Sequence, residues 1–215
     1  MAARSPRLAF VGQRTFFEAC ALSDERSAFF EFRKGGDVER HLPVWRSVPI
    51  PVADRVYGPP AGDLTVFVGR SSTHRESFLG PVKHDFDVVH VAHGFAGERL
   101  IALLREHEVG INLHNEPYPS FENRVPIHLA AGHLVISEPL SPLHGLEPGV
   151  DFLELVGPAL LGNTLEVLSR FPGAYDRVRV RGRRKAELFR ASRVYPRLVG
   201  DLLRELESGE TPRAA

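Results

Sequence analysis

Two carboxylates and two aromatic rings occur together in a short loop with two prolines, residues 115–122. Glu116 and Glu122 can contact a ribose, a sugar hydroxyl or a developing positive charge, so they are the candidate catalytic residues. Tyr118 and Phe121 can stack on a base or fill the loop. The alternative for each glutamate is a solvated loop carboxylate, so the loop alone does not identify an active site.

A short helix is predicted directly after this loop, and Pro126 limits where it begins. Proline fits only the first turn of a helix, so the helix must begin near Arg124, with Asn123 as the expected N-cap. The backbone N–H groups of Arg124 and Val125 would then be free, and the arginine adds a positive charge. Such a helix start suits a phosphate or pyrophosphate group. The alternative is a capped core helix with a solvated arginine.

A second turn from strand to helix follows the apolar run 64–69 (LTVFVG). Gly69 lets the backbone approach a ligand closely, while Arg70 and Ser71 have side chains that bind phosphate oxygens. Arg75, in the helix predicted after the turn, joins these candidate ligand-binding residues. An ordinary strand-to-helix turn is the alternative explanation.

Histidines are numerous in the same half of the chain. His128 lies one helix turn after Arg124, so it either reaches a ligand at the helix start or is a buried neutral side chain. His90 and His93 fall on opposite faces of a strand, which does not suit one metal ion. No cysteine joins them and no HExxH motif occurs, so no metal site is predicted.

The composition is that of a soluble globular protein and argues against several functions. The chain has 215 residues, 43% hydrophobic and 25% charged, with a formal net charge of zero. Zero net charge argues against nucleic acid as a partner, and the basic run 177–185 (RVRVRGRRK) reads as a solvated helix face because it lacks aromatic residues. The single cysteine, Cys20, permits no internal disulfide, and no apolar run is long enough to span a bilayer. The cytoplasm is the expected compartment.

Alternating strand and helix patterns over residues 64–155 predict an α/β fold, with a parallel, Rossmann-like sheet and helices on both faces. The expected strands are 64–69, 86–91, 109–113 and 134–136. The expected helices are one that Ser72 or Thr73 caps, then 98–107, 124–131, 158–169, and one or two within 176–207.

The first 60 residues offer roughly one βαβ unit. Its expected elements are strands 7–12 and 28–32, helices after Thr15 and Asp37, and a proline-rich connector over residues 43–60. The predicted organisation is therefore a partial α/β segment with its connector at 1–60, a Rossmann-like domain with C-terminal helices at 61–207, and a tail at 208–215.

The segment VGINLHNE…FENRVPIHLAAGHLVISEPL…EPGVDFLEL resembles the C-terminal, sugar-donor-binding half of GT-B glycosyltransferases. The nearest pattern is that of the CgeB-like enzymes and the related glycosyl transferases group 1. The shared features are an apolar strand ending in Asn112, an arginine on a helix that ends in Ala131-Gly132, and a Pro-Gly…Asp loop before C-terminal helices. LTVFVGRSSTHRESF resembles the first strand and turn of the same half, so the resemblance covers roughly residues 64–206.

This resemblance implies a metal-independent glycosyltransferase whose substrate is a nucleotide-activated sugar, with no further cofactor. The diphosphate would lie at the Arg124 helix start, facing the Gly69 turn, where positive side chains and the helix dipole stabilise it. The donor-binding residues are then expected to be Gly69, Arg70, Ser71, Arg75, Asn112, His114, Asn115, Asn123, Arg124, Val125 and His128.

Two departures from the family pattern leave the activity open. The family usually has a glutamate, expected to bind the ribose, where this sequence has His128, and most of the acceptor-binding N-terminal half has no counterpart in the pattern. One hypothesis is a glycosyltransferase whose acceptor side comes from a partner or a homodimer mate, with a glycan, protein or small molecule as acceptor. The second is a nucleotide-sugar-binding or regulatory protein without transfer activity. The third is a flavodoxin-like or receiver-like domain unrelated to sugars.

Overall fold

A computed structural model describes residues 10–11, 47–48 and 51–208 of the chain. The chain divides into two compact units, one formed by Val52–Arg190 and the other by Met1–Pro51 together with Ala191–Ala215. The helices expected after Thr15 and Asp37, and the strand expected at 28–32, lie outside the described residues.

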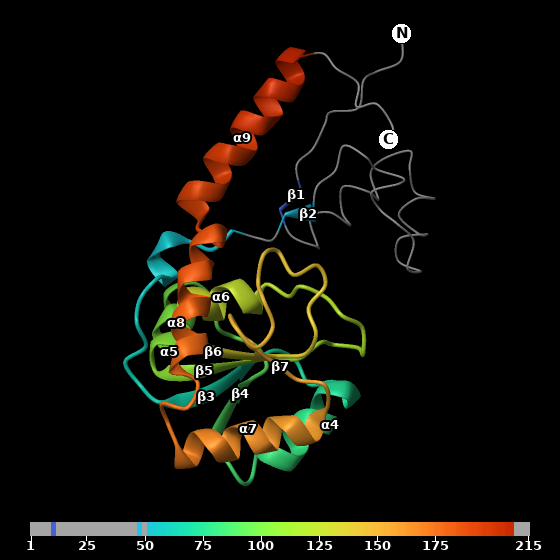
Figure 1. The fold of residues 1–215 in the computed structure, drawn as a ribbon, viewed down its shortest axis with the longest axis vertical. Helices are drawn as coiled ribbons and strands as arrows, with labels where there is room; N and C mark the ends of the chain where they lie inside the picture. Colours follow the sequence, from blue (N-terminus) through green and yellow to red (C-terminus); the bar gives the residue numbers. More distant parts are fainter. Residues whose placement is uncertain (1–9, 12–46, 49–50, 209–215) are drawn as a thin grey trace. The chain divides into compact units, whose positions relative to one another are not determined.

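The unit Val52–Arg190 is built around a five-stranded parallel sheet (Figure 1). Its strands are β3 (Leu64–Val68), β4 (Val88–Val91), β5 (His107–Asn112), β6 (Leu134–Ser137) and β7 (Leu153–Glu154), in the order β4-β3-β5-β6-β7. The predicted parallel α/β sheet is therefore confirmed. From β3 the chain adds β4 on one side of it and β5 on the other, so the direction in which strands are added reverses between β3 and β5. In open α/β sheets, ligands bind in the crevice at such a reversal.

Helices cover both faces of the sheet, as predicted. In Figure 1, α4 (Thr73–Val82) and α7 (Pro158–Arg170) lie on one side, while α5 (Gly97–Arg105), α6 (Arg124–Ala130) and α8 (Asp176–Lys185) lie on the other. Strand β6 shows why both faces are covered: Leu134 and Ile136 pack with α4 and α7, whereas Val135 packs with α6 and the short helix η2 (Ala186–Phe189). Alternate residues of a strand point to opposite faces, so an uninterrupted apolar strand needs cover on both.

Local sequence signals account for several of these helix starts. Ser72 caps α4, since its hydroxyl accepts a hydrogen bond from the Arg75 N–H at 3.3 Å. Pro158 occupies the first turn of α7, where its missing N–H has no cost. α6 begins at Arg124, as the position of Pro126 predicted.

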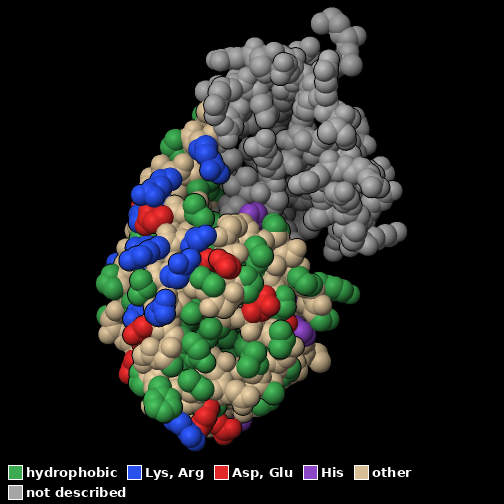
Figure 2. All heavy atoms as spheres, in the orientation of Figure 1, with side chains coloured by type: hydrophobic (Ala, Val, Ile, Leu, Met, Phe, Trp, Pro, Cys, Tyr) green, Lys and Arg blue, Asp and Glu red, His purple; other side chains and the backbone are tan. Residues whose placement is uncertain are grey.

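The basic run 177–185 falls within α8, as expected. Arg177 and Arg184 are exposed, and Arg179, Arg181 and Arg183 each lie within ion-pair distance of a carboxylate. On the face shown in Figure 2, Lys and Arg side chains gather over this helix with acidic side chains among them. The arrangement is consistent with a solvated helix face.

The other compact unit contains three described elements. β1 (Phe10–Val11) pairs in parallel with β2 (Ser47–Val48), and α9 spans Ala191–Ser208. β1 lies within the predicted strand 7–12. β2 corrects the expectation of a connector without strands over 43–60, because Ser47 and Val48 fall between prolines and keep their N–H groups for pairing.

Further elements refine the predicted boundaries. The short helix η1 (Asp54–Val56) also lies in the expected connector.

The two ends of the unit Val52–Arg190 lie side by side, since the Val52 N–H donates to the Phe189 carbonyl at 2.8 Å. No helix in the described ranges is long and apolar enough to cross a membrane.

Candidate anion-binding site

Two arginines from different helices meet at the carboxyl end of β5. Arg75 on α4 donates through Nε to the carbonyl oxygen of Leu113 at 3.0 Å, and Arg124 on α6 donates through a terminal nitrogen to the same oxygen at 2.7 Å. Both guanidinium groups lie 5.5 Å from the ring centroid of Phe67, which comes from β3. The sheet reversal between β3 and β5 thus carries a pair of positive charges, which we call the arginine pair.

Further hydrogen bonds hold each arginine in place. Arg75 also donates to the Arg70 carbonyl at 2.9 Å and to the Asn115 side-chain oxygen at 3.4 Å. Arg124 donates through Nε to the Asn112 side-chain oxygen at 3.2 Å. The pair is therefore pre-organised, so an incoming anion would not have to order these side chains.

The environment of the pair disfavours two adjacent charges unless an anion is present. Burial lowers the pKa of Arg124 to about 10; the Glu122 carboxylate opposes this shift, while the positive charge of Arg75 adds to it. Burial also lowers the pKa of Arg75. Both arginines stay protonated at neutral pH, and an anion beside them would relieve their mutual repulsion and favour the charged forms.

The two loops predicted to face each other do so. A Cβ added at Gly69 would lie 2.9 Å from a terminal nitrogen of Arg124, so the turn after β3 touches the arginine of α6. The Ser72 hydroxyl donates to the Asn115 carbonyl at 2.9 Å, which joins the start of α4 to the loop after β5. Arg70, Ser71, Asn115 and Asn123 are exposed on this edge.

The start of α6 differs from the predicted anion-binding helix tip. The Val125 N–H is not free, because it donates to the Glu122 carbonyl at 3.0 Å, and the Val125 side chain is fully buried. Asn123 stands at the N-cap position in an αR conformation without a capping hydrogen bond from its side chain. α6 has only seven residues. Positive charge at this place therefore comes from the guanidinium groups and not from a helix tip.

The two candidate catalytic glutamates occupy different surroundings. Glu116 is exposed on the loop after β5. Glu122 is half-buried, with one oxygen 3.8 Å from Arg124 and the other accepting a hydrogen bond from the Ser120 hydroxyl at 3.3 Å. Glu122 is therefore an electrostatic partner of the arginine pair, and Glu116 has the carboxylate that solvent reaches.

Asn112 and His114 are buried, and the Asn112 side chain holds Arg124. The Asn112 amide donates to the Ser137 hydroxyl at 2.9 Å while its oxygen accepts from Arg124. The His114 ring uses Nε2 for the Pro139 carbonyl at 2.8 Å and lies with Nδ1 3.0 Å from the Ser120 hydroxyl. Their polar groups are used within the protein, which corrects the expectation that these two side chains contact a ligand.

His128 takes the second of the two alternatives given by the sequence, a buried neutral histidine. Its side chain is 1% exposed, and its Nδ1 lies 2.9 Å from Nδ1 of His133. Burial, followed by the neighbouring His133, lowers its pKa well below the usual value. The ring packs on Gly110 of β5 beneath α6. As a ligand-binding residue, His128 is thus a wrong prediction, because the ring points into the core between helix and sheet.

Two residues at this edge were missed by the sequence prediction, Glu138 and His74. Glu138 follows β6 directly, and its two carboxylate oxygens accept from the His114 N–H at 2.6 Å and contact His74 Nε2 at 2.7 Å. A charged residue directly after an apolar strand of a parallel sheet is the signal that could have found Glu138. His74 carries no comparable signal.

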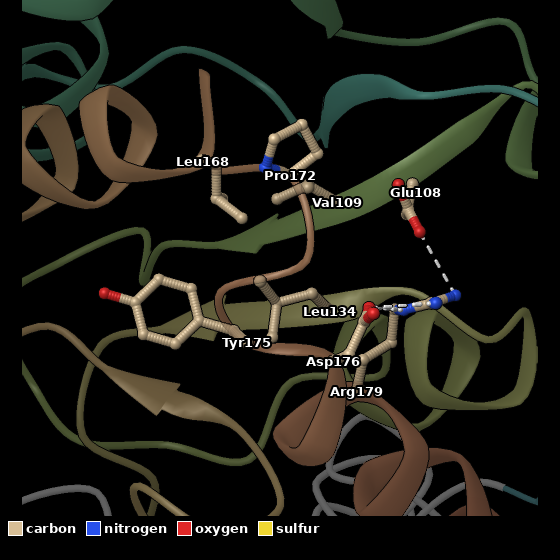
Figure 3. Close-up of a pocket in the computed structure, with 8 residues that line it drawn as sticks. All are labelled: Glu108, Val109, Leu134, Leu168, Pro172, Tyr175, Asp176 and Arg179. Carbon is tan, nitrogen blue, oxygen red and sulfur yellow. Dashed lines mark hydrogen bonds and ion pairs between the residues drawn. The ribbon is translucent and has the colours of Figure 1, made fainter. Parts of the chain in front are cut away.

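A small pocket lies at the opposite edge of the sheet, where β5 and β6 begin (Figure 3). Val109 and Leu134 contribute apolar side chains to it. Arg179 is paired there with Glu108 at 3.2 Å and with Asp176 at 3.1 Å. Two carboxylates lie within ion-pair distance of this single arginine, whereas the arginine pair has two guanidinium groups and one carboxylate, Glu122, within that distance. Within the described ranges, no three His, Cys, Asp or Glu side chains are grouped to hold a metal ion.

The chain was compared with protein-family models, curated sequences and solved structures. No protein-family model and no curated sequence matches the chain. Among solved structures, it is similar to sucrose-phosphate synthase from Thermosynechococcus elongatus, with 17% identity and a TM-score of 0.58 over 94% of this chain and 59% of that one. It is also similar to HepE from Anabaena in complex with UDP-glucose, with 11% identity and a TM-score of 0.60 over 86% of this chain and 62% of that one.

A third similar structure is the C-terminal domain of a glycosyl transferase group 1 family protein, LpcC, from Francisella tularensis, with 10% identity and a TM-score of 0.48 over 61% of this chain and 94% of that domain. The chain spans about three fifths of the length of the first two structures. It therefore has the α/β, Rossmann-like fold of its GT-B neighbours, sucrose-phosphate synthase and HepE.

Proposed function

We propose that the unit Val52–Arg190 binds a nucleotide-activated sugar and holds its diphosphate at the arginine pair. The observation that carries the proposal is the meeting of Arg75 and Arg124 on one carbonyl oxygen, that of Leu113. Arg124, whose side chain is 16% exposed, provides directed N–H donors for phosphate oxygens, and the buried Arg75 beside it adds positive charge. The similarity to HepE, whose structure contains UDP-glucose, supports the choice of a nucleotide sugar.

The exposed residues around the pair supply the remaining contacts of the proposed site. Gly69 lets the Arg124 guanidinium approach the turn after β3, and Arg70 and Ser71 are exposed on that turn. Asn115 and Asn123 are exposed on the loop that follows β5. The buried Asn112 acts in this proposal by positioning Arg124, while the buried His114 ring is held by the Pro139 carbonyl and Ser120.

Glycosyl transfer is the second part of the proposal. The fold and the sequence pattern favour an enzyme of the GT-B, group 1 type, with the CgeB-like enzymes as the subtype that the motifs resemble. In the reaction, an acceptor atom forms a bond to the anomeric carbon and gives its proton to a base, while the bond between sugar and diphosphate breaks and the diphosphate leaves with the bonding electrons. Arg75 and Arg124 would stabilise that developing charge, and this role does not call for a bound metal ion. Glu116 is the proposed catalytic carboxylate, because solvent reaches it.

Titration calorimetry with UDP, GDP and their glucose and mannose derivatives tests the binding step on the full chain, with EDTA present. We expect one of these ligands to bind and Arg124→Ala to weaken binding by about tenfold or more, since a hydrogen bond to a charged group contributes about 1.5–3 kcal/mol. Arg177→Ala, an exposed arginine of α8, is the matched control and should leave binding unchanged. Binding that is equally strong in Arg124→Ala would contradict the proposed site.

Transfer and binding without transfer are separated by a second measurement. Release of UDP or GDP from the sugar nucleotide, with and without added glycan, protein or small-molecule acceptors, reports turnover. Turnover that Glu116→Gln abolishes while binding persists would support the enzyme. Binding without turnover in any acceptor mixture would favour the alternative, a nucleotide-sugar-binding or regulatory protein.

A further inference from the structure

A single peptide group joins the arginine pair to a carboxylate–imidazole pair. The carbonyl oxygen between Leu113 and His114 accepts from Arg75 and Arg124, and the N–H of the same peptide group donates to Glu138 at 2.6 Å. The other oxygen of Glu138 contacts His74 Nε2 at 2.7 Å. Four side chains from three elements are thus connected through one peptide bond.

His74 has a ring nitrogen that is not used within this network. Its Nε2 faces Glu138, and no hydrogen-bond partner of its Nδ1 is found among the described residues. The His74 side chain is 20% exposed, whereas that of Glu138 is 8% exposed. A carboxylate on one ring nitrogen fixes the orientation of an imidazole, and in a protonated ring Nδ1 is also a hydrogen-bond donor.

The position of His74 places this donor at the same edge as the arginine pair. It lies in the first turn of α4, one residue before Arg75, and it reaches the end of β6 while Arg75 reaches the end of β5. The charged and titratable groups around the network are Glu138 after β6, His114 after β5, Glu122 and Arg124 at the start of α6, and Arg75 on α4.

We propose that His74 is a further anion-binding residue of this site and that Glu138 is its positioning residue. The phosphate oxygens of the sugar donor are the ligand, so the inference rests on the proposed function. The network gives a reason for a carboxylate near an anion site, because Glu138 orients both His74 and the peptide group. A protonated His74 would add positive charge to the site, so the proposal predicts stronger anion binding at lower pH.

A purely structural role for the pair makes a different prediction. If the contact between His74 and Glu138 only holds α4 against the end of β6, any side chain that donates a hydrogen bond to Glu138 from the position of Nε2 should preserve anion binding. Glutamine provides such a donor and cannot be protonated. His74→Gln therefore keeps this contact and removes the titratable group.

The test uses the full-length chain and inorganic pyrophosphate as well as UDP. We expect NMR titration of the His74 ring to show a midpoint that rises when pyrophosphate is added, because an adjacent anion favours the charged ring. Pyrophosphate and UDP also take up protons between about pH 8 and about pH 5, so the comparison is between proteins at each pH. We expect the ratio of wild-type to His74→Gln affinity to rise to about five- to tenfold at the lower pH.

Two matched variants complete the experiment. His84→Gln, at an exposed histidine beyond the end of α4, should keep the wild-type pH dependence. Glu138→Gln should reduce the pH dependence while leaving the arginines in place. A His74 titration that pyrophosphate does not move, or equal affinity of wild type and His74→Gln at every pH, overturns the inference even if UDP binds through Arg124. Conversely, a midpoint moved by pyrophosphate with no nucleotide binding supports the inference and refutes the proposed function.

Discussion

Arg75 and Arg124 donate hydrogen bonds to one carbonyl oxygen, that of Leu113, from two helices on opposite faces of the sheet. The two guanidinium groups also lie over the same Phe67 ring. The Glu122 carboxylate lies 3.8 Å from Arg124, so within ion-pair distance one carboxylate faces two guanidinium groups. The relationship therefore explains why the strand reversal between β3 and β5 is the place to look for a ligand.

Replacement of Arg75 by lysine tests whether geometry or charge matters at this site. Lysine keeps the positive charge but cannot reach the carbonyls of Leu113 and Arg70 together, as the guanidinium does. We expect Arg75→Lys to lower the free energy of unfolding by about 0.5–1.5 kcal/mol in urea titrations, because hydrogen bonds are lost while the Leu113 carbonyl keeps Arg124 as a donor. Nucleotide affinity should fall as well. Arg177→Lys on α8 is the control, and equal stability of the two variants would contradict the argument.

Substitution of Gly69 by alanine is expected to affect binding more than stability. The added Cβ would lie 2.9 Å from the end of the Arg124 side chain, which is flexible enough to move aside. Such a displacement takes a guanidinium out of the site while the core remains packed. We predict a nucleotide affinity about tenfold lower in calorimetry, since a charge-assisted hydrogen bond is lost, and a change in unfolding free energy below about 1 kcal/mol. Unchanged affinity would show that Arg124 does not bind the ligand from this position.

Gly110 lies beneath the buried ring of His128. Its replacement should affect stability more than ligand binding. An added Cβ would lie 2.5 Å from the imidazole, which has no room to move. We expect Gly110→Ala to lower the unfolding free energy by about 1–3 kcal/mol or more, as overpacking of a core does. Gly80→Ala on α4 is the matched control, because no atom lies within 4 Å of its added Cβ. It should be neutral or slightly stabilising.

The buried histidines make stability depend on pH in a definite direction. Burial lowers the pKa of His133 from the usual 6.5 to about 4 in the folded protein. Between these values the unfolded chain binds the proton and the folded chain does not, so stability is full above about pH 6.5 and falls as pH drops towards 4. A difference of about 2.5 units corresponds to about 3 kcal/mol at about 1.4 kcal/mol per unit.

Urea unfolding at a series of pH values measures this effect. His133→Gln keeps a donor for the Leu104 carbonyl, which His133 Nε2 contacts at 2.7 Å, but removes the titration. The loss of stability between pH 6.5 and 4 should therefore be smaller in this variant than in wild type. His84→Gln should behave like wild type, and a His133→Gln profile that matches wild type would refute the assignment.

Much of the fold could be predicted because it depends on local patterns. The apolar strand 64–69, the cap at Ser72 and the limit that Pro126 sets on the start of α6 are each encoded within a few residues. The candidate site was found in part for the same reason. Gly69 and Arg124 were each recognised from their own turn, and the structure brings these turns together.

The remaining features depend on which strands become neighbours. β5 lies between β3 and β6, and only this order brings Arg75 and Arg124 to one carbonyl and Glu138 to the N–H of the same peptide group. The sequence cannot show that His128 faces Gly110, since a helix position near an expected site is compatible with either side of the helix. Sequence alone determined the elements, through periodicity, caps and prolines. The tertiary structure decided which charges share a site, because those contacts join residues from separate strands and helices.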